Sequence, residues 1–176
     1  MDLEGYKGNK PVRVGNQAVE HIQNDTYGQV MLSLLPLYTD RRFIFEERQD
    51  SSKWINDILS QIDATIDEAD AGIWEFRTMA HHHCYTNLFQ WAGCKAAVKM
   101  AKHIGDDRLQ KRAEELMQKA ADRIEACYDP ERQVYTMAEG IEALDASTLQ
   151  LILMHYLDPN SERARNHLKA HEQELK

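Results

Sequence analysis

The residues best suited to acid–base chemistry lie in the run Asp70-Ala71-Gly72-Ile73-Trp74-Glu75-Phe76-Arg77. A carboxyl group beside an indole is a candidate general acid, because an apolar neighbour disfavours the charged form and raises the pKa. The Trp74 ring could also stack on a ring-shaped ligand. In a plainer alternative, Trp74 anchors the core and Glu75 pairs with Arg77 at the surface. Residue types alone favour that plainer alternative.

Two polar runs near the N-terminus form a second candidate site. The first contains Lys10, Arg13 and Asn16, and the second is Gln23-Asn24-Asp25-Thr26-Tyr27-Gly28. Amide, carboxylate and guanidinium groups are the donors and acceptors that bind hydroxyl-rich ligands. A helix cap at Asn16 followed by a polar helix face would account for the same residues, and composition does not decide between the two interpretations.

The histidines and cysteines do not predict a metal site. His81, His82 and His83 are adjacent, and side chains of neighbouring residues diverge. His167 and His171 have the spacing of one helix face, but a surface position is the simpler interpretation. Three cysteines without CxxC spacing are expected to be reduced thiols. We predict no metal and no cofactor.

The bulk composition excludes two classes of partner. The 176 residues are 43% hydrophobic and carry a net charge of -8. A nucleic-acid partner would favour a basic surface instead. No apolar run approaches the roughly 20 residues that span a bilayer, and residues 1–6 do not have the pattern of a signal peptide. We therefore expect no nucleic-acid or membrane partner and a cytoplasmic location, although a truncated chain would leave export open.

Apolar spacing predicts six helices after an irregular loop over residues 1–15, which contains three glycines and Pro11. Ser51 or Ser52 is expected to cap the second helix, with Trp54 on its apolar stripe, and Gly105 to end the third. A short strand is possible at Gln133–Thr136. The predicted helices lie at about 16–38, 51–66, 85–104, 106–127, 146–157 and 161–176. Pairs of helices joined by short turns fit either a helical solenoid or part of an α/α toroid.

Four blocks in order resemble the bacterial glucoamylase-like members of glycoside hydrolase family 15. They are Gly5–Asn16, Gln23–Gly28, Gly72–Arg77 and Leu144–Leu149 with its continuation to Pro159. The resemblance implies an all-α fold, with residues 1–176 as one fragment that supplies about half of an (α/α)6 barrel. It also implies inverting hydrolysis of terminal α-glucosidic bonds, with two carboxylates roughly 6.5–9.5 Å apart.

The resemblance assigns roles to individual residues. Glu75 is the general acid, and the general base and an upstream Arg-Asp pair lie outside the chain. The implied substrate-binding residues are Lys10, Arg13, Asn16, Trp74, Arg77 and His82. Phe76 and Asn87 depart from the family pattern, which leaves the preferred linkage open.

The sequence therefore predicts a fragment of an α-glucosidase that is inactive alone. Its substrate would be a starch-, dextran- or trehalose-like α-glucoside. The alternative is a sugar-binding or scaffold module that has the same fold without the chemistry. Because half a barrel leaves helix faces uncovered, we also expect a homo-oligomer or contacts with the remainder of the same polypeptide.

Overall fold

The computed structural model describes residues 3–8, 10, 15, 21–43, 51–76 and 79–175. Their α-helices are α1 (Asp25–Thr39), α2 (Ser51–Thr65), α3 (Cys84–Ile104), α4 (Asp107–Glu125), α5 (Gln150–Leu153) and α6 (Glu162–Glu174). The short 3-10 helices η1 (Tyr6–Gly8) and η3 (Ala146–Leu149) and an antiparallel pair of strands, β1 (Tyr128–Asp129) and β2 (Val134–Tyr135), complete the described elements. The predicted all-α class is confirmed, and the helices are consistent with part of a helical barrel.

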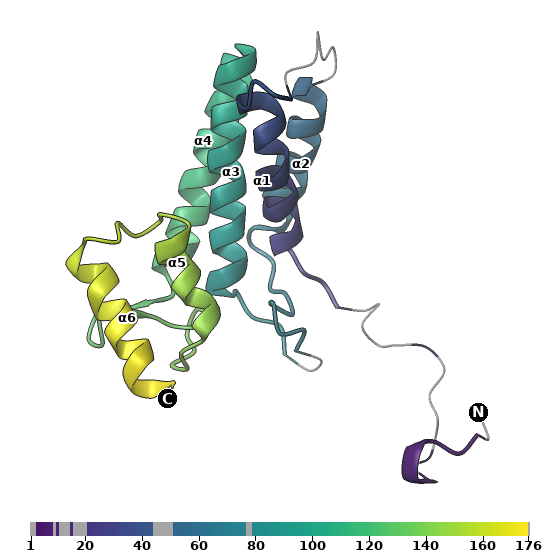
Figure 1. Cartoon of the computed structure of the whole chain (residues 1–176), viewed down its shortest axis with the longest axis vertical. Coiled ribbons are helices and arrows are strands. Elements are labelled where there is room, and N and C mark those ends of the chain that lie inside the picture. The colour runs from purple at the N-terminus through teal and green to yellow at the C-terminus, as the bar shows by residue number, and fades with distance from the viewer. Residues whose placement is uncertain are drawn as a thin grey trace.

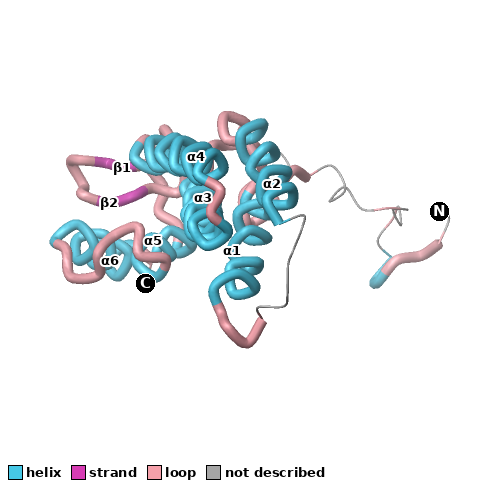
Figure 2. The backbone as a smooth tube through the Cα atoms, turned by 90° about the horizontal axis from the view of Figure 1, so that it is seen from above, coloured by secondary structure: helices cyan, strands magenta, loops and turns pink. Residues whose placement is uncertain are grey.

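The helices form two groups (Figure 1). Helices α1 to α4 lie side by side as a bundle, and their buried side chains form one apolar core. The small sheet, α5 and α6 pack around a second core on one side of α3 and α4 (Figure 2), beside the ends of these helices that lie lower in Figure 1. No described helix is long and apolar enough to cross a membrane.

Helices α1 and α3 approach closely because two glycines face each other at their crossing. A Cβ atom built on Gly28 would lie 2.0 Å from the backbone oxygen of Phe89. One built on Gly93 would lie 2.6 Å from the Cα atom of Gly28. Backbone contact of this kind leaves no room for any side chain at Gly28. The crossing fixes the first turn of α1 against residues 89–93 of α3.

The boundaries of α3, α4 and α6 follow the capping signals in the sequence. Gly105 ends α3 with a positive φ of 74°, as predicted. The Asp106 side chain accepts a hydrogen bond from Leu109 N at the start of α4, and the Ser161 side chain accepts one from Ala164 N at the start of α6. These oxygens satisfy backbone donors that the first helical turn leaves unpaired.

Three expectations about the helices were wrong. Residues 21–24 are not helical, so α1 begins at Asp25 and not near Asn16. The predicted helix over 146–157 is a 3-10 turn followed by α5 alone, because His155 has a φ of 56° and the amides of Tyr156 and Leu157 both bond back to Leu151 O. Trp54 is 66% exposed and lies off the buried stripe of α2.

Candidate functional site

The Trp74-Glu75 dipeptide lies on the loop that follows α2 (residues 66–76, the site loop), and a buried carboxylate fixes the base of that loop. Asp70 is 1% exposed. Its carboxylate accepts hydrogen bonds from Asn24 N at 2.9 Å, Gly72 N at 3.2 Å and Thr86 Oγ1 at 2.9 Å. Asp70 therefore joins the start of α1, the loop itself and the first turn of α3.

The segment before α1 braces the same loop from one side. Ala71 N donates to Ile22 O at 2.9 Å, and Gln23 Nε2 donates to Gly72 O at 3.2 Å. On the other side, the loop pairs with the next segment, since Asp70 and His81 exchange two backbone hydrogen bonds of 3.0 Å. In the structure, then, the polar run at Gln23 and Asn24 holds the loop in place.

The imidazole of His83 packs against the inner side of the loop. His83 is buried and stacks on Phe76, with ring centroids 6.0 Å apart and planes 17° apart. A Cβ atom on Gly72 would lie 2.7 Å from the His83 ring, and Gly72 has a positive φ of 63°. Burial lowers the pKa of His83, so the ring is neutral near pH 7. The loop thus rests on an uncharged aromatic surface.

Glu75 lies at the exposed tip of this braced loop. It is a non-glycine residue with a φ of 52°, and its amide donates to Gly72 O at 3.1 Å in a tight turn. Within the described part of the chain, its carboxyl makes no hydrogen bond or ion pair. Positive φ values outside glycine are uncommon and concentrate at functional sites. Among the described residues, therefore, no side chain competes with a ligand for the Glu75 carboxyl.

Trp74 is not a core anchor, because its side chain is 59% exposed. Its indole Nε1–H donates a hydrogen bond to Asp145 Oδ2, across 71 positions of the sequence. The exposed indole therefore has a defined orientation beside Glu75. The structure therefore combines an exposed carboxyl with an adjacent aromatic ring whose indole N–H is bound by Asp145.

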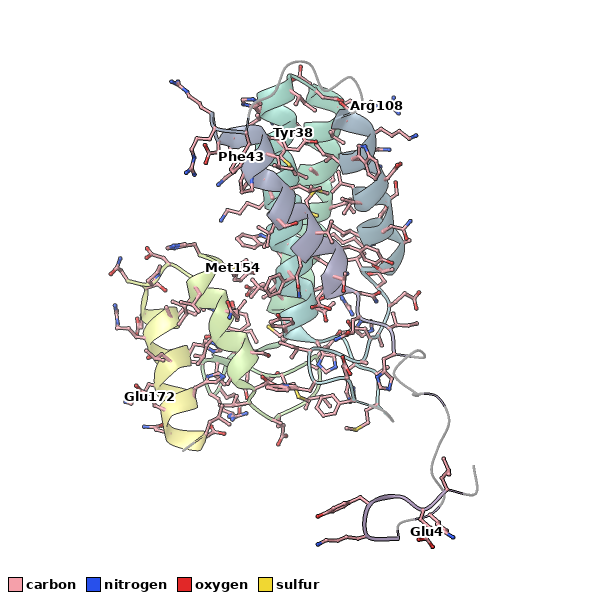
Figure 3. The ribbon with its side chains drawn as sticks, turned by 45° about the vertical axis from the view of Figure 1, so that its right-hand side comes forward. Glu4, Tyr38, Phe43, Arg108, Met154 and Glu172 are labelled. Carbon is pink, nitrogen blue, oxygen red and sulfur yellow. The ribbon has the colours of Figure 1, made fainter. Side chains whose placement is uncertain are left out.

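The structure brings together some of the sequence-predicted residues and leaves others apart. Trp74 and Glu75 are adjacent, and His82 lies on the segment that pairs with their loop. Lys10 forms an ion pair of 3.7 Å with Glu4, which lies away from the helices (Figure 3). Arg13, Asn16 and Arg77 lie outside the described residues, so their roles stay predictions, as do those of Lys10 and His82. No group of three metal-ligating side chains occurs in the described ranges.

Sequence reasoning missed the residues that support the site. Asp70 stood in the candidate run without a role of its own, and His83 was considered only as one of three adjacent histidines. Asp145 was noted only as part of a resembling block. His167 and His171 are buried, not at the surface, because His167 hydrogen-bonds Tyr135 N and Thr148 O while His171 bonds back to His167 O. The sequence offered one signal of this burial, because a helix with few apolar residues must bury other side chains and His167 and His171 lie on one face of it at i,i+4 spacing.

Comparison with known proteins identifies the family of this chain. The model for "Glycosyl hydrolases family 15" matches residues 1–176. The chain is 28% identical to a trehalase of Thermoplasma acidophilum and 32% identical to a trehalase of Mycobacterium tuberculosis, over 99% and 98% of its length. It spans only 30% and 25% of those two proteins. No solved structure matches the chain.

Proposed function

The chain belongs to glycosyl hydrolase family 15, and from this premise we propose that it forms the acid side of an inverting α-glucosidase site. In this proposal Glu75 protonates the glycosidic oxygen of the departing sugar. A second carboxylate, expected outside residues 1–176, activates water on the opposite face of the ring. The observation that carries the proposal is the exposed Glu75 carboxyl on a loop braced by Asp70 and Asp145.

Trehalose is the substrate that we favour. The similar proteins of Thermoplasma acidophilum and Mycobacterium tuberculosis are named trehalases, and the similarity to each extends over nearly the whole of this chain. The substrate-binding set inferred from the sequence (Lys10, Arg13, Asn16, Trp74, Arg77 and His82) would surround the sugar bound next to Glu75. Maltose, isomaltose and starch are the competing α-glucosides.

Glucose release by the full-length protein tests this proposal. Trehalose, maltose, isomaltose and starch are offered at equal glucosyl concentration, and the anomers of the product are followed by NMR. Inversion at one end of α,α-trehalose yields one β-glucose and one α-glucose, whereas retention yields α-glucose alone. We expect trehalose to be hydrolysed fastest, with β-glucose and α-glucose formed in equal amounts.

The role of Glu75 is tested with Glu75→Gln, which retains the shape of the side chain and removes its proton. Loss of a general acid costs about a hundredfold or more in rate. Glu68→Gln is the matched control, because Glu68 is exposed nearby, at the start of the site loop. A Glu75→Gln variant as active as the parent would reject the proposal. An inactive parent would favour the alternative of a sugar-binding or scaffold module.

A further inference from the structure

We propose that Asp145 is a positioning residue for Glu75 and that it acts through the hydrogen bond to the Trp74 indole. The inference rests on the proposed function of Glu75 and adds a residue 70 positions away in the sequence. It concerns the contact between the tip of the site loop and η3. Asp70 and the residues that donate hydrogen bonds to it (Asn24, Gly72 and Thr86, the Asp70 cluster) do not make this contact.

The tip of the loop has few other constraints. Its backbone hydrogen bonds, from Glu75 N to Gly72 O and from Phe76 N to Ala71 O, remain within the loop. Ile73 and Trp74 are 37% and 59% exposed, so packing restrains them weakly. Among the described residues, the bond to Asp145 is the side-chain hydrogen bond that ties positions 73–75 to another element.

Asp145 is itself held firmly. It is 8% exposed, and its Oδ1 accepts a hydrogen bond of 2.6 Å from Ser147 N at the start of η3. Its carbonyl oxygen accepts from Thr148 Oγ1 at 2.8 Å and lies 3.1 Å from Nε2 of the buried His171. The carboxylate therefore has one oxygen used for capping and one free to bind the indole.

The energetics favour one orientation of Trp74. An indole N–H can only donate, and a buried carboxylate oxygen without a donor is costly. Rotation of Trp74 away from Asp145 would leave the second carboxylate oxygen without its partner. Because Glu75 follows Trp74 directly in a turn with positive φ, the direction of the Glu75 carboxyl depends on where Trp74 is held. Catalytic groups displaced by about 1 Å can lose about a hundredfold in rate.

Two substitutions break the contact from opposite sides. Trp74→Phe retains an aromatic ring and removes the N–H donor. Asp145→Ser removes the acceptor for the indole but leaves a hydroxyl that can still cap η3 through Ser147 N. Trp54→Phe is the matched control, because Trp54 is 66% exposed on α2 and lies outside the site. All are made in the full-length protein, together with the double variant and Glu75→Gln.

We expect Trp74→Phe and Asp145→Ser each to lower kcat on trehalose by about tenfold or more. In Asp145→Ser, which changes no residue of the proposed substrate-binding set, KM should change less than about threefold. The kcat of the double variant should equal that of the more impaired single variant, because each single substitution already removes the same contact. Thermal midpoints, measured in parallel, should stay far above the assay temperature. Trp54→Phe should retain the parental kcat.

Several results would overturn the inference. These are parental kcat in both single variants, effects that multiply in the double variant, or a loss confined to KM in Asp145→Ser. If Glu75→Gln is inactive in the same assays, the proposed function survives while the role of Asp145 fails. If Glu75→Gln remains active, the proposed function fails first and the role of Asp145 fails with it.

Discussion

Replacement of Gly28 by alanine should disrupt the site from a distance, through the crossing of α1 and α3. The new Cβ atom would lie 2.0 Å from Phe89 O and 2.8 Å from Gln90 N. Both are backbone atoms of α3 and cannot rotate away. Since contacts under 3.0 Å essentially never occur for real Cβ atoms, the two helices must separate by about 1 Å.

That displacement is large compared with the tolerance of the Asp70 cluster. Asp70 accepts one hydrogen bond from Asn24 N, next to α1, and one from Thr86 Oγ1 in α3, both of 2.9 Å. An added separation of about 1 Å would stretch one of these bonds beyond hydrogen-bonding range. Overpacking costs about 3 kcal/mol, offset by about 1 kcal/mol of improved helix propensity, for a net loss of about 2 kcal/mol.

The assay compares Gly28→Ala with Gly105→Ala in the full-length protein, by thermal midpoint and by kcat on trehalose. Gly105 has a positive φ of 74° and no atom within 4 Å of its added Cβ, so its substitution costs about 1 kcal/mol of backbone strain alone. We expect both variants to melt earlier, and Gly28→Ala alone to lose about tenfold or more in kcat. Parental stability and activity in Gly28→Ala would refute the reasoning.

Three further predictions concern polar side chains that make several hydrogen bonds. Burial and the neighbouring His171 lower the pKa of His167 to about 4, below its unfolded value of about 6.5, so about 3 kcal/mol of stability should be lost as pH falls from about 6.5 to about 4. His167→Gln can make both hydrogen bonds but does not titrate, so the thermal midpoint of this variant should depend less on pH over that range. A midpoint that falls as steeply as in the parent would contradict the assignment of the effect to His167. Burial opposes the charge of Glu125, but hydrogen bonds from Tyr156, Tyr135 and Arg163 lower its pKa overall. Glu125→Gln should therefore destabilise the protein by about 1 kcal/mol in urea unfolding, whereas the exposed Glu131→Gln should not. Asp70→Asn should cost about 1–3 kcal/mol and reduce kcat, because an amide cannot accept from all three donors; unchanged kcat would show that the loop needs no such brace.

The sequence was sufficient to predict most of the long helices, because apolar spacing and end signals agree there. Gly105 and Ser161 are found where the capping rules place them, and the apolar stripe of α4 faces the core. The start of α1 was misplaced because the residues before Asp25 retain apolar spacing while their backbone bonds to the site loop. Local patterns do not contain that long-range contact.

The site was only partly predictable for a related reason. The motif around Glu75 is continuous in the sequence, so it can be identified from its residues. Its supports come from other elements: Asp70 binds Asn24 and Thr86, and Trp74 binds Asp145. Such pairings depend on tertiary packing, and no spacing rule connects Trp74 with a residue 71 positions later.

The proton-donating role of Glu75 is tested most directly with a substrate that does not need the proton. The full-length protein and its Glu75→Gln variant are assayed on trehalose and on α-glucosyl fluoride, because fluoride can depart without protonation. We expect the variant to lose about a hundredfold or more on trehalose while it retains most of its rate on the fluoride. Equal losses on both substrates, or no loss on trehalose, would contradict the assignment of Glu75 as the general acid.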